Sequence, residues 1–317
     1  MASIISSRQA RDLLASTGFL LALMISSCAS VNVDMQGTEA ASRVDIFIVT
    51  TDQTTASEVL RRLQDVENLP AAQPGETPWY RGHLTGVSDG SVYTILVGQA
   101  DSHDDTTMRA VLRKSTTAWR PRYVLVLGTT AAVAYDAPLG AVGLVILTCD
   151  FDLDRFEESG DAGFCHRPDG GLYSSALSIA DDWETAATTK ANRTGCDPAR
   201  VLKMAALSGH GAIEPRLVEI ATQVSEERHR GLIIEREGIF AVQAVEDLRR
   251  AMREPIGFLA IRGVSEVRVP GTRPEDKPEA SEPELRLLQE SCAARDTADF
   301  AVELIRRRWP VSSKAKR

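Results

Sequence analysis

Short apolar runs alternate with helical patterns along the chain from Val44 onward. Four runs are nearly continuous in apolar residues, which is typical of strands buried on both faces of a sheet: VDIFIVT at 44–50, SVYTILVG at 91–98, RYVLVLG at 122–128 and VGLVILT at 142–148. Apolar spacing of the helical kind predicts helices over 55–66, 104–118, 214–228, 238–252 and 284–308, and further strands are expected near 203–208 and 256–263. The pattern predicts one α/β domain over 43–310, with a central mixed, largely parallel sheet flanked by helices.

Residues 1–42 contain the one extended apolar run of the chain, LLASTGFLLALMISSCASVNV. Arg8 and Arg11 precede it, and the sequence ISSC, which ends at Cys28, resembles a bacterial lipobox. This order predicts an export signal or an anchor that brings the chain to a membrane. Two alternatives stay open: a true start at Met35, or an amphipathic segment packed on a partner. The chain is cytoplasmic if the segment is not a signal, and membrane-anchored or exported if it is.

The charge balance is slightly acidic. The chain has 36 Lys and Arg against 44 Asp and Glu, a formal net charge of −8. Nucleic-acid binding depends on clustered basic residues, so this balance argues against a nucleic-acid partner. The basic tail at 311–317 is an exception, and such a run at a chain end is usually solvated.

Five cysteines are scattered without a CxxC pair, and the five histidines form no HExxH motif. The spacing predicts no metal site and no disulfide framework, with the thiols acting as small buried apolar side chains. We also expect no cofactor.

Polar residues follow four predicted strands, where ligands of open α/β sheets bind. The segments are TTDQ after the first strand, GTT after the third, EREG after 231–234 and SE after 256–263. In EREG, an ionised Glu237 can accept hydrogen bonds from two sugar hydroxyls, or Glu235 and Glu237 can simply favour the N-terminus of a helix. In SE, Glu266 is either a general acid with a pKa raised by burial or part of a surface turn.

Taken in order, these segments resemble the nucleoside phosphorylase and nucleosidase superfamily, and within it the nucleotide-cleaving branch of bacterial antiphage defence. The resemblance covers about 44–310 and rests on VDIFIVTTDQ, WRPRYVLVLGTTAAVAYDAPLGAVGLVIL, ALSG, IIEREG for the EMEG motif of the family, IRGVSE for its GxSD motif, and AARDTADFAVELI for its closing Ala-rich helix. It implies cleavage of the N-glycosidic bond of a purine nucleoside or nucleotide. Because family members are commonly dimers, trimers or hexamers, it also implies a homo-oligomer.

The resemblance also implies roles for individual residues. Glu237 would hold the ribose hydroxyls, Glu266 would protonate the purine at N7, and Ser265 would orient Glu266. Gly128 and Thr129 would lie on the phosphate or water side of the sugar. Arg236 in the IIEREG motif and Thr50 at the end of the first strand complete the expected substrate-binding set.

The chain departs from the family pattern in three places. Glu266 stands where the family has Asp, which lengthens the acid by one methylene. Thr55 stands about where the family has the Glu that activates water; Asp52 or Glu58 is the candidate substitute, and we take Asp52 as the catalytic one. The GTTAA sequence beginning at Gly128 lacks two family glycines, which narrows the space for phosphate.

These departures favour hydrolysis over phosphorolysis. The leading hypothesis is a hydrolase that releases the base from a purine nucleoside or nucleotide. The alternative is a catalytically degenerate member that binds a nucleoside or nucleotide as a sensor or interaction module. A third hypothesis is an exported protein that reuses the fold for an unrelated surface role.

Overall fold

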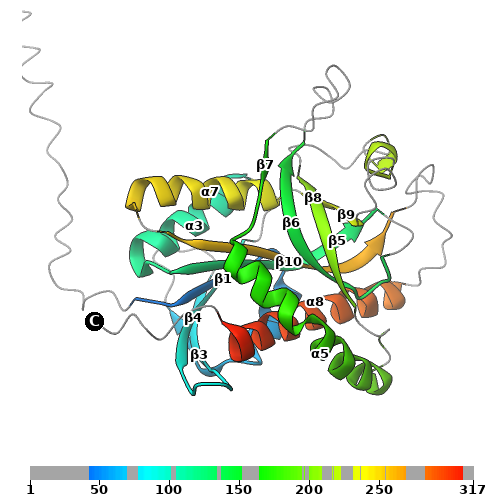
Figure 1. The fold of residues 1–317 in the computed structure, drawn as a ribbon, viewed down its shortest axis with the longest axis horizontal. Coiled ribbons are helices and arrows are strands. Elements are labelled where there is room, and N and C mark those ends of the chain that lie inside the picture. The colour runs from blue at the N-terminus through cyan, green and yellow to red at the C-terminus, as the bar shows by residue number, and fades with distance from the viewer. Residues whose placement is uncertain are drawn as a thin grey trace, which may run out of the picture. The chain divides into compact units, whose positions relative to one another are not determined.

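The structure, a computed structural model, describes most of the chain between Arg43 and Trp309 (Figure 1). The described residues are 43–69, 78–100, 105–133, 137–151, 164–194, 196, 200–208, 216, 218–222, 231–235, 237–253, 255–268 and 283–309. The chain divides into a unit of Met1–Ser42 and a unit of Arg43–Arg317, and every described helix and strand belongs to the second. The predicted N-terminal segment and basic tail lie outside the described residues. None of the helices in the described ranges has the length and hydropathy needed to cross a membrane.

The described strands form one mixed sheet: β1 (Ile46–Thr50), β2 (Gln64–Leu69), β3 (Trp79–Thr85), β4 (Val92–Gln99), β5 (Tyr123–Ala132), β6 (Val142–Asp150), β7 (Cys165–His166), β8 (Val201–Ser208), β9 (Gly231–Glu235) and β10 (Gly257–Val267). The order is β10-β6-β8-β9-β5-β1-β4-β3-β2, and β7 pairs with β6. β10 also pairs with β5, so β10, β6, β8, β9 and β5 close on themselves, while β1, β4, β3 and β2 extend from β5 as an open arm.

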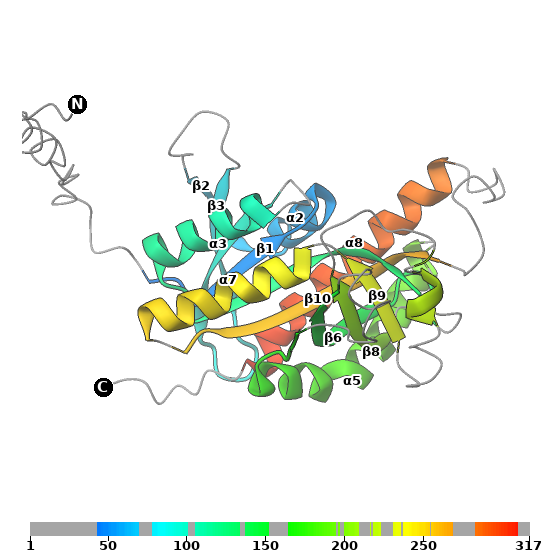
Figure 2. The ribbon, with the colours of Figure 1, turned by 90° about the horizontal axis from the view of Figure 1, so that it is seen from above.

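Helices cover both faces of the sheet. α3 (Asp105–Trp119) and α7 (Glu237–Met252) pack together on one face, and α2 (Gln53–Leu60), α5 (Gly170–Thr194) and α8 (Pro283–Arg308) lie on the other (Figures 1 and 2). The predicted α/β class, the single domain and the mixed sheet are therefore confirmed.

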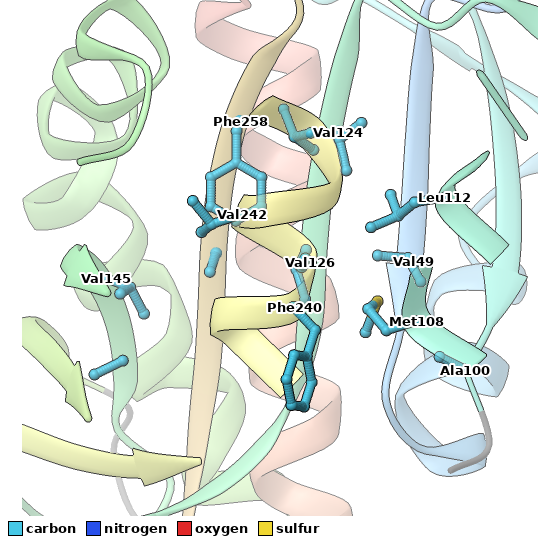
Figure 3. Packing of buried hydrophobic residues seen from close by; sticks show 14 of the residues in the cluster. Val49, Ala100, Met108, Leu112, Val124, Val126, Val145, Phe240, Val242 and Phe258 are labelled. Atoms are coloured by element: carbon cyan, nitrogen blue, oxygen red, sulfur yellow. The ribbon is translucent and has the colours of Figure 1, made fainter. Parts of the chain in front are cut away.

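The continuous apolar pattern of β5 follows from this double cover. Val124 and Val126 belong to the core under α3 and α7, where Figure 3 shows Val126 near Phe240 of α7. Leu125 and Leu127, which alternate with them, belong to the core under α2, α5 and α8. Because both faces of the strand are buried, nearly every position is apolar.

Several predicted boundaries were wrong. The predicted helix over 55–66 ends as α2 at Leu60, and its last part belongs to the exposed edge strand β2. The sheet is mixed, as predicted: parallel pairings such as those of β1 with β4 and β5 stand beside antiparallel pairings of β3 with β2 and β4. β5 and β10 also extend further than predicted, so the GTT and SE segments lie within strands instead of after them. Of the predicted helix over 214–228, only 216 and 218–222 are described, and they are helical.

Helix α5 was missed altogether. Its residues in the core on this face of the sheet are Leu172, Ala176, Ile179, Trp183 and Ala187, which have helical spacing. Two of these five are alanines, whose small side chains give a weak periodic signal in the sequence.

The expectation of no disulfides was also wrong. The structure pairs Cys149 with Cys165 and Cys196 with Cys292. The partners are 16 and 96 residues apart in the sequence, so no local motif marks either pair.

Gly263 allows α8 to approach β10 closely. A Cβ atom there would collide with the backbone oxygen of Ala293 and would lie 2.6 Å from Oγ1 of Thr297. The hydroxyl group of Thr297 donates a hydrogen bond to that backbone oxygen. We expect Gly263→Ala to lower the free energy of unfolding by about 1–3 kcal/mol, because backbone must move to admit the methyl group. Gly170→Ala is the control, since a Cβ there meets nothing within 4 Å. Equal urea midpoints for the two variants would contradict the close contact.

Asp296 of α8 makes stability depend on pH. Burial raises the pKa of its carboxyl to about 6, although Arg295 opposes the rise through a charge contact and a hydrogen bond of 2.9 Å. Because the folded protein holds this proton more tightly than the unfolded chain does, the stability that the proton contributes is lost as the pH rises from about 4 to about 6. Asp296→Asn should remove this loss, so that its stability relative to the parent increases by about 1–3 kcal/mol over the same range. Urea unfolding at pH 4, 5, 6 and 7 measures the difference, and a difference that does not change with pH would contradict the assignment.

Candidate functional site

The ends of several strands meet at one edge of the sheet. β1 and β10 both run parallel to β5, so their carboxyl ends lie at the same edge. Glu266 of β10 is opposite Ala131 of β5, and Ala131 is opposite Ile234 of β9. With about 4.8 Å between neighbouring strands, Glu266 and Ile234 are roughly 10 Å apart along this row. The row brings the SE and EREG segments to one region of the domain.

A buried ion-pair cluster lies beside this row. Arg262 of β10 is completely buried and follows Phe258 and Ala260 at two-residue spacing, so it points to the same face, towards α7. Its Nε atom is 2.5 Å from Oε2 of Glu235 and its Nη2 atom is 3.9 Å from Oε2 of Glu237. The two acids of the EREG segment therefore share one guanidinium group.

Thr51 completes the cluster. The Nη1 atom of Arg262 donates a hydrogen bond of 3.2 Å to Oγ1 of Thr51. Thr51 follows β1, so the hydrogen bond connects the residue after β1 to β10, the first and last described strands in chain order. Arg262 thus holds the ends of β1, β9 and β10 together.

Burial destabilises the charged form of Glu235. Burial raises the pKa of the Glu235 carboxyl and the neighbouring Glu237 raises it further, whereas Arg262 lowers it; the net direction is upward. Among the described residues, neither oxygen of Glu235 has an aligned hydrogen bond, and neither do Nε and Nη2 of Arg262. The contact is therefore an ion pair without hydrogen-bond alignment. The carboxylate oxygens can therefore accept hydrogen bonds from a polar ligand or water, and the guanidinium N–H groups can donate them.

Two glycines make room for the cluster. Gly128 is opposite Arg262 in the β5–β10 pairing, and a Cβ atom there would overlap Oγ1 of Thr51 and lie 2.8 Å from Nη1 of Arg262. A Cβ atom on Gly238 would overlap the carboxylate of Glu235. Each glycine is required because the neighbouring polar group occupies the place of a side chain.

Asp52 serves as the N-cap of α2. Its carboxylate accepts hydrogen bonds from the backbone N of Thr55 at 2.6 Å, from Oγ1 of Thr55 at 2.8 Å and from the backbone N of Thr129 at 3.1 Å. The cap therefore ties the loop after β1 to β5. Thr50, just before this loop, is fully buried.

A β-bulge changes the direction of the Ser265–Glu266 pair. The register of β10 against β5 shifts between Val264 and Glu266. Val264 and Val267 both pack on the core under α7, although they are three residues apart, so the bulge turns the two residues between them away from that core. Ser265 donates a hydrogen bond of 3.3 Å to the backbone oxygen of Thr130, and the carboxylate of Glu266 is 3.6 Å from Nε of Arg268. Glu266 is thereby kept at the surface of the domain, with about a third of its side chain exposed (32%).

The predicted site residues fall into three local groups. Glu237 and Gly128 join the Arg262 cluster, Asp52 joins Thr129, and the Ser265–Glu266 pair lies on the neighbouring bulge. Arg236 lies outside the described residues.

Sequence reasoning missed Arg262, Thr51 and the ion pair made by Glu235. A signal was present, since an arginine in the middle of the apolar strand GFLAIRGV requires a buried acid.

In the described ranges, no group of three or more His, Cys, Asp or Glu side chains is placed to hold a metal ion.

Comparison with known proteins identifies the fold. No family model matches the sequence, and no curated protein matches it. The structure is similar to the 5′-methylthioadenosine/S-adenosylhomocysteine nucleosidase of Neisseria meningitidis in complex with methylthio-immucillin-A, with a TM-score of 0.60 and 15% identity over 83% of this chain and 98% of that one. It is also similar to the futalosine hydrolase of Helicobacter pylori (TM-score 0.57, 15% identity, 83% and 97% covered) and to a nucleosidase of Colwellia psychrerythraea in complex with adenine (TM-score 0.59, 13% identity, 83% and 95% covered).

The chain therefore shares the fold of these nucleosidases and of futalosine hydrolase, which agrees with the fold that the resemblance implied.

The ion pair of Arg262 can be tested by removing one partner or both. Arg262→Met should lower the free energy of unfolding by about 3–5 kcal/mol, because it leaves the buried charge of Glu235 without a partner. The double variant Arg262→Met, Glu235→Met should recover much of this loss. The defect of the single variant should also become smaller as the pH falls, because Glu235 can then take up a proton. Equal losses in the single and double variants at every pH would contradict the pairing.

Proposed function

We propose that the domain releases the base from a purine nucleoside or nucleotide by hydrolysis of the N-glycosidic bond. The observation that carries the proposal is the buried cluster of Arg262, Glu235 and Glu237 at the strand ends of a nucleosidase fold. Solved structures of this fold are named as nucleosidases and a hydrolase, and two of them hold a nucleoside analogue or adenine.

The chemistry requires three things of the protein. Cleavage passes through a transition state that resembles an oxocarbenium ion, so the sugar must be held, the departing base must receive a proton and water must be presented to C1′. A carboxylate suits the first task, because it accepts two hydroxyl hydrogen bonds at once.

Glu237 is the proposed ribose ligand. Its side chain is 10% exposed, and its Oε2 atom is 3.9 Å from Nη2 of Arg262. A ligand there would also lie next to the unsatisfied polar atoms of Glu235 and Arg262.

Glu266 is the proposed acid for the purine N7. Glu266 is separated from Ile234 of β9 by one strand, β5. A nucleoside is long enough to reach from Glu237, just after β9, to Glu266. The partial exposure of Glu266 allows it to exchange protons with solvent. Ser265 would fix the bulge through its bond to Thr130 and so orient Glu266.

Hydrolysis is favoured over phosphorolysis by the state of Arg262. Its charge is balanced by Glu235, and Glu237 lies beside it, so the cluster has no net positive charge to attract a phosphate dianion. Thr51 and Arg262 also fill the space beside Gly128, where the resemblance puts phosphate. Asp52 and Thr129 would then lie on the water side of the sugar.

Asp52 gives a specific reason to keep a second candidate function. Both oxygens of its carboxylate already accept hydrogen bonds, three in total, from Thr55 and Thr129, which leaves less acceptor capacity for a catalytic water molecule. Binding of a nucleoside or nucleotide without cleavage is therefore the alternative. A homo-oligomer, a membrane contact and a role in antiphage defence stay predictions.

Two measurements on the purified protein separate the candidates. Incubation with adenosine, methylthioadenosine or ATP, followed by chromatography, detects free base; thermal unfolding with the same compounds detects binding. Free base supports the hydrolase, and stabilisation without free base supports the binding module. If none of the compounds releases a free base and none stabilises the protein, both candidate functions are contradicted.

If base is released, Glu266→Gln should lower the rate constant of base release about 100-fold or more while ligand binding persists, because an amide is not an acid and cannot protonate the purine. Glu237→Ala should weaken binding and turnover together. Glu67→Gln is the control, since Glu67 is an exposed acid of the edge strand β2 that pairs with Arg81. Unchanged turnover in Glu266→Gln would rule out the acid role.

A further inference from the structure

Every cysteine in the described part of the chain is in a disulfide. Cys149 pairs with Cys165 and Cys196 pairs with Cys292. The fifth cysteine of the sequence, Cys28, belongs to the N-terminal apolar segment. The folded domain therefore has no described free thiol.

The first disulfide joins neighbouring strands. Cys149 of β6 and Cys165 of β7 are directly opposite in an antiparallel pairing, with their Cα atoms 4.0 Å apart. The backbone N of Asp150 donates a hydrogen bond of 2.9 Å to the oxygen of Phe164 beside them. β7 has two residues, too few to hold a strand by backbone hydrogen bonds alone, so the disulfide fastens it.

This disulfide lies near the candidate site. Thr148, the residue before Cys149, is buried, and its methyl group would be 3.3 Å from a Cβ atom on Gly238. The carboxylate of Glu235 occupies the space where a side chain on Gly238 would lie. The first disulfide therefore stiffens the strand that supports this end of the Arg262 cluster.

The second disulfide joins two helices of one face. Cys196 follows α5, Cys292 is buried in α8, and their Cα atoms are 5.9 Å apart. The loop that it closes is 96 residues long in sequence separation, and long loops gain most from a cross-link in the chain-entropy account. It holds the end of α5 to the helix that packs on β10.

Two independent features indicate the same compartment. Disulfides persist in oxidising compartments and are rare in the cytosol, where thiols are kept reduced. The segment before the domain has the order of an export signal: Arg8 and Arg11, then an apolar run that ends in ISSC at Cys28. One feature comes from the folded domain and the other from a segment outside it.

We propose that the chain is exported by its N-terminal segment and that the domain folds outside the cytoplasm with both disulfides formed. Each bond forms when two thiols lose two protons and two electrons to a disulfide-bearing oxidant of that compartment. If the proposed function also holds, the ligand is a nucleoside or nucleotide found outside the cytoplasm. The export proposal itself stands without any activity of the domain.

The first test follows the full chain in a bacterial host. Cells are fractionated, thiols are trapped with acid, and the protein is labelled with a maleimide polymer before and after reduction. We expect the chain outside the cytoplasm, with its four domain cysteines labelled only after reduction. Leu21→Arg, Leu23→Arg is the control, because charges in the apolar run should block export and leave these cysteines reduced. A wild-type chain that stays in the cytoplasm with all its cysteines labelled without reduction would overturn the proposal.

The second test uses the purified protein and no nucleoside, so it does not depend on the proposed function. A reductant should lower the melting temperature of the wild-type protein by about 10 °C, because both cross-links are lost. The variant with Cys149→Ser, Cys165→Ser, Cys196→Ser and Cys292→Ser should not respond to reductant. If that variant does not fold, the wild-type measurement alone decides, and an unchanged melting temperature would overturn the proposal.

Discussion

The charge of Arg262 is the constraint on which the site depends. A fully buried guanidinium group must have an acidic partner, and Glu235 supplies one at 2.5 Å. The partner comes from β9, and the hydroxyl group of Thr51 comes from the end of β1. One side chain of β10 thereby fixes the relative positions of strands that are far apart in the sequence.

Other local features follow from this constraint. Gly128 and Gly238 lack side chains because Thr51, Arg262 and Glu235 occupy the space. α7 begins at Glu237, which places a second acid within 3.9 Å of the same guanidinium group. The bulge of β10 then turns the Ser265–Glu266 pair out of the core. An ion pair within the core thus lies beside the acids that we propose for sugar and base recognition, at one edge of the sheet.

The sequence predicted the class of the fold because continuous apolar runs reveal strands covered on both faces. It also predicted that the EREG acids come at the end of a strand, which agrees with the end of β9 at Glu235, but it placed Ser265 and Glu266 after a strand, and they lie within β10. It could not reveal α5, whose buried face includes two alanines, or the extension of β5 and β10 beyond their apolar parts. It also missed the disulfides and the Thr51 contact, because partners separated by 16, 96 or 211 residues leave no local pattern.

The most direct test of the central claim is a crystal structure with a purine nucleoside analogue that cannot be cleaved. The account predicts ribose hydroxyls within hydrogen-bond distance of the Glu237 carboxylate and the base on the Glu266 side of the row, with the Arg262–Glu235 pair intact behind them. A ligand bound elsewhere, or no ligand at a saturating concentration, would contradict it for both the hydrolase and the binding module.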